Sequence, residues 1–121
     1  MADYVKFETP KELADSQLAL IEKARKGGKI RLGSNEVTKA IERGNAKLVV
    51  IAQDVSPPEV VMHLPLLCEE KKIPYGYVET KKELGEKAGM KVGTSAIAVE
   101  NEGDAKKELE DIVKKLAELK K

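Results

Sequence analysis

The stretch at residues 47–52 (Lys-Leu-Val-Val-Ile-Ala) constrains the fold more than any other part of the chain. It is almost entirely apolar and rich in β-branched residues, which is typical of a strand buried on both faces of a sheet. Such a strand needs helices on both sides, and helical and strand-like patterns do alternate along this chain. The sequence therefore predicts an α/β fold, a three-layer α/β/α sandwich with a mixed four-stranded sheet.

Glycine and proline residues separate the expected elements from one another. The expected helices are 10–26, 35–43, a helical region at 57–72, 81–88 and one that follows Asp104, and the expected strands are 29–32, 47–52, 73–78 and 95–99. Pro65 lies inside the helical region 57–72 and should kink or divide it. The sequence contains no linker or internal repeat, so we expect residues 1–121 to form a single domain.

The composition narrows the class of protein. Hydrophobic residues make up 41% of the chain, enough for one core, and no apolar run approaches the roughly 20 residues of a membrane span. The single cysteine, Cys68, allows no internal disulfide and fits a reducing compartment, so we expect a cytoplasmic protein. The net charge is only +1, but five basic and two acidic residues lie between Lys29 and Lys47. A compact basic face with little general charge favours a selective reader of nucleic acid over a protein that coats it.

Residues 33–44, at the start of an expected helix, carry the strongest functional signal. Asn35 and Glu36 fall on the first turn and Lys39 one turn later, so an amide, a carboxylate and an ammonium group can converge outside the helix start. That set matches the exposed edge of a guanine, which has acceptors at O6 and N7 and donors at N1 and N2. A phosphate would be repelled by the Glu36 carboxylate. The structural alternative is a well-capped helix in which Ser34 or Asn35 is the cap and Glu36 complements the dipole.

Groups suited to catalysis or metal binding are few. The only histidine, His63, and the only cysteine lie in the helical region 57–72, where a structural or surface role is expected for the histidine and a core position for the cysteine. The sequence has no Walker-type loop and no G-x-G-x-x-G loop, and a metal site would need more histidine or cysteine ligands. We therefore expect no enzyme activity, no cofactor and no metal. Gln53 and Asp54 follow the buried strand, where α/β folds often bind ligands, but a turn and a helix cap are the simpler interpretation.

The chain resembles the archaeal members of the L7Ae family of ribosomal proteins, which bind kink-turn RNA. Residues 33–39 match the G-x-N-E-x-T-K signature of that family, and the similarity extends over 46–52, 63–71, 73–75, 82–88 and 101–103. The resemblance implies an α/β/α sandwich that binds kink-turns and K-loops, which are RNA internal loops bent beside tandem sheared G·A pairs. Sheared pairing leaves guanine O6 and N1–H exposed, and these are the groups that the polar residues of the signature could read.

The resemblance also assigns roles to individual residues. It implies base contact by the signature side chains, backbone contact or support by their basic and small neighbours, and a hydrophobic loop at 90–95 that packs against a flipped-out nucleotide. Leu32 stands where many members carry a second basic residue, which implies one phosphate contact fewer. The residues so implicated in RNA binding are Arg31, Gly33, Ser34, Asn35, Glu36, Lys39, Arg43, Val60, Met90, Thr94 and Ser95.

The partners implied by the resemblance are structured RNAs with tandem sheared G·A pairs: ribosomal RNA, guide RNA and RNase P RNA. The protein would then be a component of the large ribosomal subunit, shared with box C/D and H/ACA guide ribonucleoproteins and with RNase P. Core proteins of the guide particles would be recruited around residues 58–64, and we expect no membrane contact and a monomer when the protein is free. Two alternatives stay open: a protein–protein scaffold or ribosome-associated adaptor of the same fold without selective RNA binding, and a small-ligand domain that uses Gln53 and Asp54.

Overall fold

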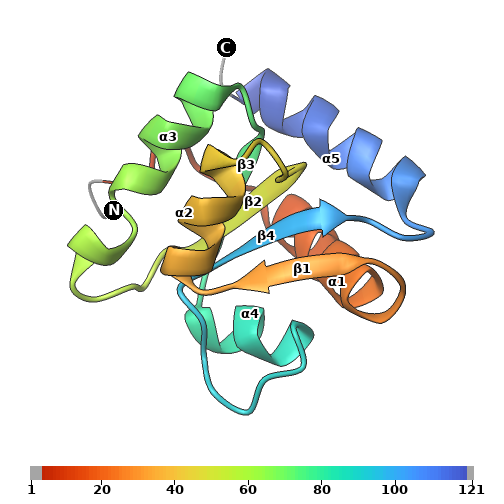
Figure 1. The fold of residues 1–121 in the computed structure, drawn as a ribbon, viewed down its shortest axis with the longest axis horizontal. Coiled ribbons are helices and arrows are strands. Elements are labelled where there is room, and N and C mark those ends of the chain that lie inside the picture. Colours follow the sequence, from red (N-terminus) through yellow and green to blue (C-terminus); the bar gives the residue numbers. More distant parts are fainter. Residues whose placement is uncertain (1–3, 120–121) are drawn as a thin grey trace.

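A computed structural model describes residues 4–119 of the chain, and short strands alternate with helices along it (Figure 1). The elements are helix α1 (Lys11–Gly27), strand β1 (Lys29–Leu32), helix α2 (Ser34–Glu42), strand β2 (Leu48–Ala52), the 3-10 turn η1 (Pro58–Val60), helix α3 (His63–Lys71), strand β3 (Tyr75–Val78), helix α4 (Lys81–Lys87), strand β4 (Ala96–Asn101) and helix α5 (Lys106–Leu119).

The four strands form one mixed sheet in the order β1-β4-β2-β3. Strand β4 pairs antiparallel with both β1 and β2, whereas β2 and β3 are parallel. The last strand of the chain is therefore inserted between the first two. A similar sheet was expected from the sequence, and within the described residues the mixed four-stranded arrangement confirms that prediction.

Helices cover both faces of the sheet. In the view of Figure 1, α2 and α3 lie in front of the sheet and α1 lies behind it, while α4 and α5 contact α1. All five residues of β2 are buried, as expected for a strand with helices on both sides. No helix in the described part of the chain is long and apolar enough to cross a membrane.

The proline-rich segment differs from its expected form. The break falls at residues 61–62, between η1 and α3, and not at Pro65. Pro65 instead lies buried in the first turn of α3. Backbone N–H groups in a first helical turn have no partner within the helix, so proline costs no hydrogen bond there. The prediction that Pro65 kinks or divides a helix was therefore wrong.

A cluster of aromatic side chains fastens the N-terminal segment to the sheet. The Tyr77 hydroxyl donates to the carbonyl of Tyr4 at 2.6 Å and accepts the N–H of Lys6 at 3.1 Å, and the Tyr4 hydroxyl donates to the carbonyl of Ala52 at 2.7 Å. Burial raises the pKa of Tyr75 to about 12 and raises that of Tyr77 further. Both phenols therefore stay protonated even at mildly alkaline pH, where Tyr77 keeps its hydrogen bond to Tyr4.

Helix α2 ends in a turn that requires glycine. Gly44 has φ 72°, its N–H donates to Ile41 O, and the N–H of Asn45 donates to Ala40 O, each at 3.0 Å. This pair of bonds is the Schellman arrangement, in which a left-handed residue satisfies the last carbonyl groups of the helix. An L residue with a Cβ is strained in that conformation.

We expect Gly44→Ala to lower the free energy of unfolding by about 1–2 kcal/mol, because alanine is strained at a left-handed φ. Gly27→Ala is the matched control: an added Cβ meets no atom within 4 Å at either position, but Gly27 is the last residue of α1 and has no positive φ. Alanine at Gly27 should be neutral or stabilising by up to about 1 kcal/mol. Urea unfolding followed by circular dichroism measures both, and equal effects would contradict the expectation.

Candidate nucleic-acid interface

The junction between β1 and α2 is made by Gly33. Its φ is 87°, its N–H donates to the carbonyl of Ala96 at 2.9 Å, and its own carbonyl accepts the N–H of Val37 at 2.9 Å. Gly33 is thus the N-cap residue of α2, and no side chain forms a cap hydrogen bond there. The structural alternative, in which Ser34 or Asn35 is the cap, is not what the structure has, because the sharp turn out of β1 places a glycine at the cap position. Neither side chain is committed to capping.

The charged side chains of the first helical turns lie together at the surface. Glu36 Oε2 and Lys39 Nζ are 3.4 Å apart, and their side chains are 47% and 56% exposed. Asn35 precedes Glu36 on the same turn and is also exposed. The structure therefore brings the acid and the amine side by side, facing solvent, with the amide on the same turn. An exposed pair of this kind adds little to stability, so its polar groups can exchange partners at low cost.

The loop at 90–95 leads to the same junction. The bond between Gly33 and Ala96 places the start of β4 beside the start of α2, and Ser95 O accepts the N–H of Ala52 at 3.0 Å. Thr94 is only 6% exposed, and its hydroxyl donates to Ala96 O at 3.4 Å, so it supports the loop from inside. Met90 is partly buried against the core, whereas Val92 is 68% exposed.

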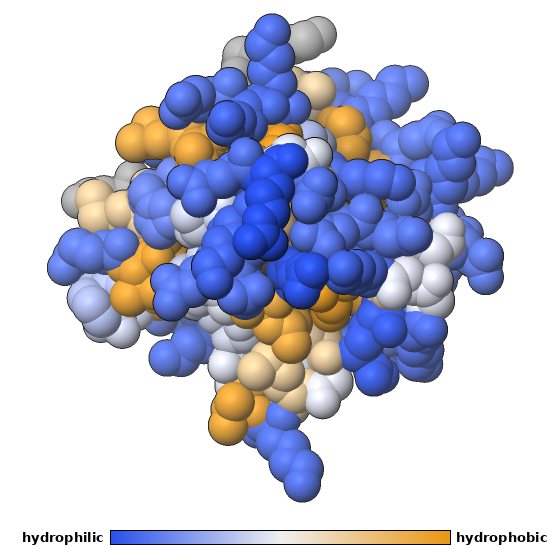
Figure 2. Space-filling view, in the orientation of Figure 1, coloured by the Kyte–Doolittle hydropathy of each residue, from blue (hydrophilic) through white to orange (hydrophobic). Residues whose placement is uncertain are grey.

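The surface near this junction is unevenly polar (Figure 2). The surface over α2 is mostly hydrophilic, whereas apolar surface gathers on the side of η1 and α3 and at the end of the molecule where the 90–95 loop lies. The exposed large hydrophobic residues there are Val60 in η1, Met62 between η1 and α3, and Leu66 in α3. A polar helix start with apolar surface on its flanks can offer hydrogen bonds to the edge of a base and contact area to its ring.

A hydrogen bond ties α2 to α3. Thr38 Oγ1 donates to the carbonyl of Ser34 at 2.6 Å and lies 2.7 Å from His63 Nε2. Because the single hydroxyl proton goes to the carbonyl, His63 must donate its Nε2–H to Thr38. The exposed histidine therefore links α3 to α2, in keeping with the structural or surface role expected from the sequence. The sequence predicted neither this hydrogen bond nor that Thr38 is the partner of His63.

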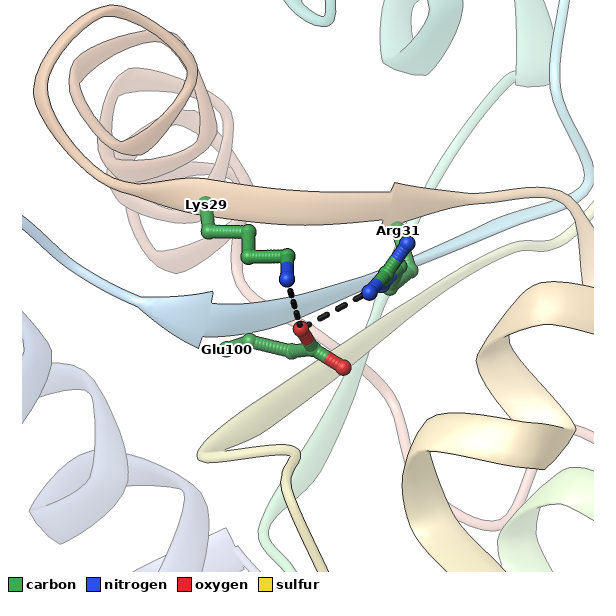
Figure 3. A network of polar contacts seen from close by, with 3 residues as sticks. All are labelled: Lys29, Arg31 and Glu100. Atoms are coloured by element: carbon green, nitrogen blue, oxygen red, sulfur yellow. Dashed lines mark hydrogen bonds and ion pairs between the residues drawn. The ribbon is translucent and has the colours of Figure 1, made fainter. Parts of the chain in front are cut away.

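The basic residues of β1 are held by a carboxylate on β4 (Figure 3). Arg31 Nε and Lys29 Nζ lie 3.2 and 3.7 Å from the same atom, Glu100 Oε1. The three side chains lie in front of the sheet, on the face that α2 covers. Arg31, one of the residues implicated in RNA backbone contact, is thus engaged within the protein, although its side chain stays 35% exposed.

A second carboxylate balances the basic residue before β2. Lys47 Nζ donates to Glu102 Oε1 at 2.7 Å, and this hydrogen bond holds the pKa of Glu102 below its usual range. The positive charge that the sequence places between residues 29 and 47 is therefore partly neutralised by two glutamates from the end of β4 and the turn that follows it. Arg43 is exposed at the other end of α2, about 12 Å along the helix axis from Asn35. The structure does not bring Arg43 together with the residues at the helix start.

The residues after β2 have a structural use. Asp54 Oδ1 accepts the N–H of Lys81, the first residue of α4, at 2.8 Å. Asp54 thus satisfies a backbone donor at the start of that helix, which favours the turn-and-cap interpretation over a ligand site. Gln53 lines a surface cavity between the start of α1 and the end of β3.

A role for Glu100 was not predicted from the sequence. Its side chain is 10% exposed and follows the four buried apolar residues of β4, so a charged residue comes directly after the apolar part of the strand. That departure was visible in the sequence. Which residues Glu100 faces depends on the register of β1 against β4, which no local pattern provides.

The fold and the junction together define an α/β/α sandwich with a polar helix start exposed at one end of its sheet. The chain matches the model of the ribosomal protein L7Ae/L30e/S12e/Gadd45 family over residues 15–109 and belongs to that family. Among solved structures it is similar to the Giardia lamblia 15.5 kD RNA-binding protein, with 33% sequence identity and a TM-score of 0.91 over 98% of this chain and 99% of that one. The family predicted from the sequence is confirmed.

A double-mutant cycle tests the bond between α2 and α3. Thr38→Val and His63→Ala should each lower the free energy of unfolding, with a coupling free energy of about 0.5–1 kcal/mol, because either change removes the same hydrogen bond. As a control, Thr38→Val combined with Glu110→Ala on α5, across the sheet, should be additive. The free energies come from urea unfolding of the variants. A coupling free energy near zero for Thr38 and His63 would show that the bond is absent in solution.

Proposed function

We propose that the chain is a non-enzymatic RNA-binding protein that recognises kink-turns and K-loops. The observation that carries the proposal is the exposed Glu36–Lys39 pair, 3.4 Å apart at the start of α2 and beside Asn35. The family membership and the likeness to a 15.5 kD RNA-binding protein support RNA as the ligand. The recognised feature is the guanine edge that tandem sheared G·A pairs expose.

The chemistry of the pair matches that edge. The Glu36 carboxylate accepts the N1–H and N2–H donors of a guanine, and the Lys39 ammonium donates to O6 or N7. In the free protein the two side chains satisfy each other at 3.4 Å, and a guanine inserted between them replaces one polar contact with two. Ordinary duplex pairing hides N1–H, so the same pair gains much less from a regular helix.

Apolar side chains near the Glu36–Lys39 pair would provide a second contact, with the ring of a nucleotide. The 90–95 loop joins β4 beside Gly33, and Met90 and Val92 give it apolar side chains, with Val60 on η1 adding an exposed one. A nucleotide flipped out of the bend packs its ring on such a surface. Thr94, which is buried, acts by holding the loop and not by touching the RNA.

Recognition of kink-turn RNA would suit particular ribonucleoprotein particles. We propose that the protein acts in the cytoplasm as a component of the large ribosomal subunit and of box C/D and H/ACA guide ribonucleoproteins and RNase P. By binding only the bent form, it shifts the RNA from an extended to a kinked conformation. Core proteins of the guide particles would dock around residues 58–64, where Val60 and Met62 are 38% and 39% exposed.

A second candidate is a scaffold of the same fold without selective RNA binding. Two observations favour it: Arg31 and Lys29 already have a carboxylate partner, and Leu66 on α3 is 61% exposed. Neutralised cations weaken attraction to phosphate, and exposed apolar residues favour protein contact. The scaffold would bind a kink-turn and a regular duplex equally and weakly.

Glu36→Ala and Lys39→Ala should each weaken kink-turn binding by about 1–3 kcal/mol while the protein stays folded, because each removes a contact to a base edge. Gel-shift titrations of a kink-turn RNA, and of the same RNA with its G·A pairs replaced by Watson–Crick pairs, measure the effect. Glu12→Ala is the matched control, since Glu12 is also an exposed first-turn glutamate, but of α1. Kink-turn affinity that is unchanged in both α2 variants would reject base reading by this pair.

A further inference from the structure

We propose that Glu100 is a specificity-determining residue, which occupies the cationic groups of Lys29 and Arg31 and so limits sequence-independent binding to RNA phosphates. The inference rests on the proposed function, because it concerns how the RNA-binding surface discriminates between kink-turn RNA and regular duplex RNA. Glu100 acts through its two partners and needs no contact with the RNA itself.

The geometry makes Glu100 the shared partner of both cations. A single atom, Glu100 Oε1, lies 3.2 Å from Arg31 Nε and 3.7 Å from Lys29 Nζ (Figure 3). The glutamate side chain is 10% exposed, whereas the lysine and arginine side chains are 57% and 35% exposed. The carboxylate thus lies beneath the cations, and an approaching phosphate meets the cations first.

The register of the sheet holds this arrangement. Arg31 pairs with Ala98 across the β1–β4 ladder, and Glu100 lies two residues further along the same face of β4. A largely buried carboxylate is screened less by salt than an exposed one, so it continues to compete with phosphate at moderate ionic strength. Any phosphate that binds Lys29 or Arg31 must share the cation with Glu100.

This competition acts unequally on correct and incorrect RNAs. In a regular duplex, phosphate contacts supply nearly all of the affinity, and the RNA can slide until it uses every free cation. In a kink-turn complex the base contacts at α2 fix the register, and Lys29 lies about 13 Å along the strand from Gly33, beyond the helix start. Neutralising the two cations therefore costs the duplex more than the kink-turn.

The test is Glu100→Gln, which keeps the shape of the side chain and removes its charge. Binding of the kink-turn RNA and of its G·A-disrupted duplex is measured by fluorescence anisotropy from about 50 to 200 mM salt. We expect duplex affinity to rise about 5- to 10-fold near 0.1 M salt and the salt slope to steepen by about 1–2, because each freed cation adds a phosphate contact. Kink-turn affinity should rise less, so the ratio of the two affinities falls.

Glu108→Gln is the matched control. Glu108 pairs with Lys23 between α5 and α1, on the other face of the sheet, so the substitution makes the same change in net charge away from α2. Its duplex affinity and salt slope should stay near those of the wild type. The double variant Lys29→Gln/Glu100→Gln should lose part of the gain seen in Glu100→Gln, and it provides a second test if the single variant is destabilised in thermal unfolding.

The outcomes separate this inference from the function on which it rests. A wild-type protein that binds both RNAs equally overturns the proposed function. A selective wild type combined with an unchanged salt slope and affinity ratio in Glu100→Gln overturns the role of Glu100 alone. Weaker binding of both RNAs by Glu100→Gln also overturns it, because the carboxylate would then be orienting the cations for phosphate instead of withholding them.

Discussion

The antiparallel pairing of β1 with β4 is the constraint on which the candidate interface depends. Because β4 lies between β1 and β2, its first residue, Ala96, accepts the N–H of Gly33 where β1 turns into α2. One end of this ladder sets the start of α2 beside the 90–95 loop, and the other end sets Glu100 against Lys29 and Arg31. A slip of one residue would turn Glu100 to the opposite face of the sheet and separate these groups.

The interface combines exposed hydrogen-bonding groups with internally balanced charge. The pair on α2 faces solvent, while the cations of β1 and of residue 47 have glutamate partners at the end of β4 and in the turn that follows it. A protein whose net charge is only +1 gains little from general attraction to a polyanion, so discrimination must come from a few directed contacts. In the proposed function, the same charge distribution therefore explains both the weak electrostatic attraction to RNA in general and the need for specific contacts to base edges.

Sequence reasoning recovered the parts of the molecule that local patterns determine. The buried strand expected at 47–52 is β2, Leu48–Ala52, and the helix expected at 81–88 is α4, Lys81–Lys87; both follow from residue type and spacing. It failed where tertiary packing decides: Pro65 fits the first turn of a helix whose start the sequence does not mark. It could not find the contact between Thr38 and His63 or the partners of Glu100, because both depend on how distant segments are aligned. The set of RNA-contacting residues stays a prediction.

The bond from His63 to Thr38 has a practical consequence for following this molecule in solution. His63 Nε2 on α3 lies 2.7 Å from Thr38 Oγ1 on α2, so the environment of the ring depends on how these two helices are placed. His63 is also the only histidine of the chain. Its imidazole resonances are therefore a unique, unlabelled spectroscopic reporter of the spacing between α2 and α3, and any ligand that moves one helix against the other will change them.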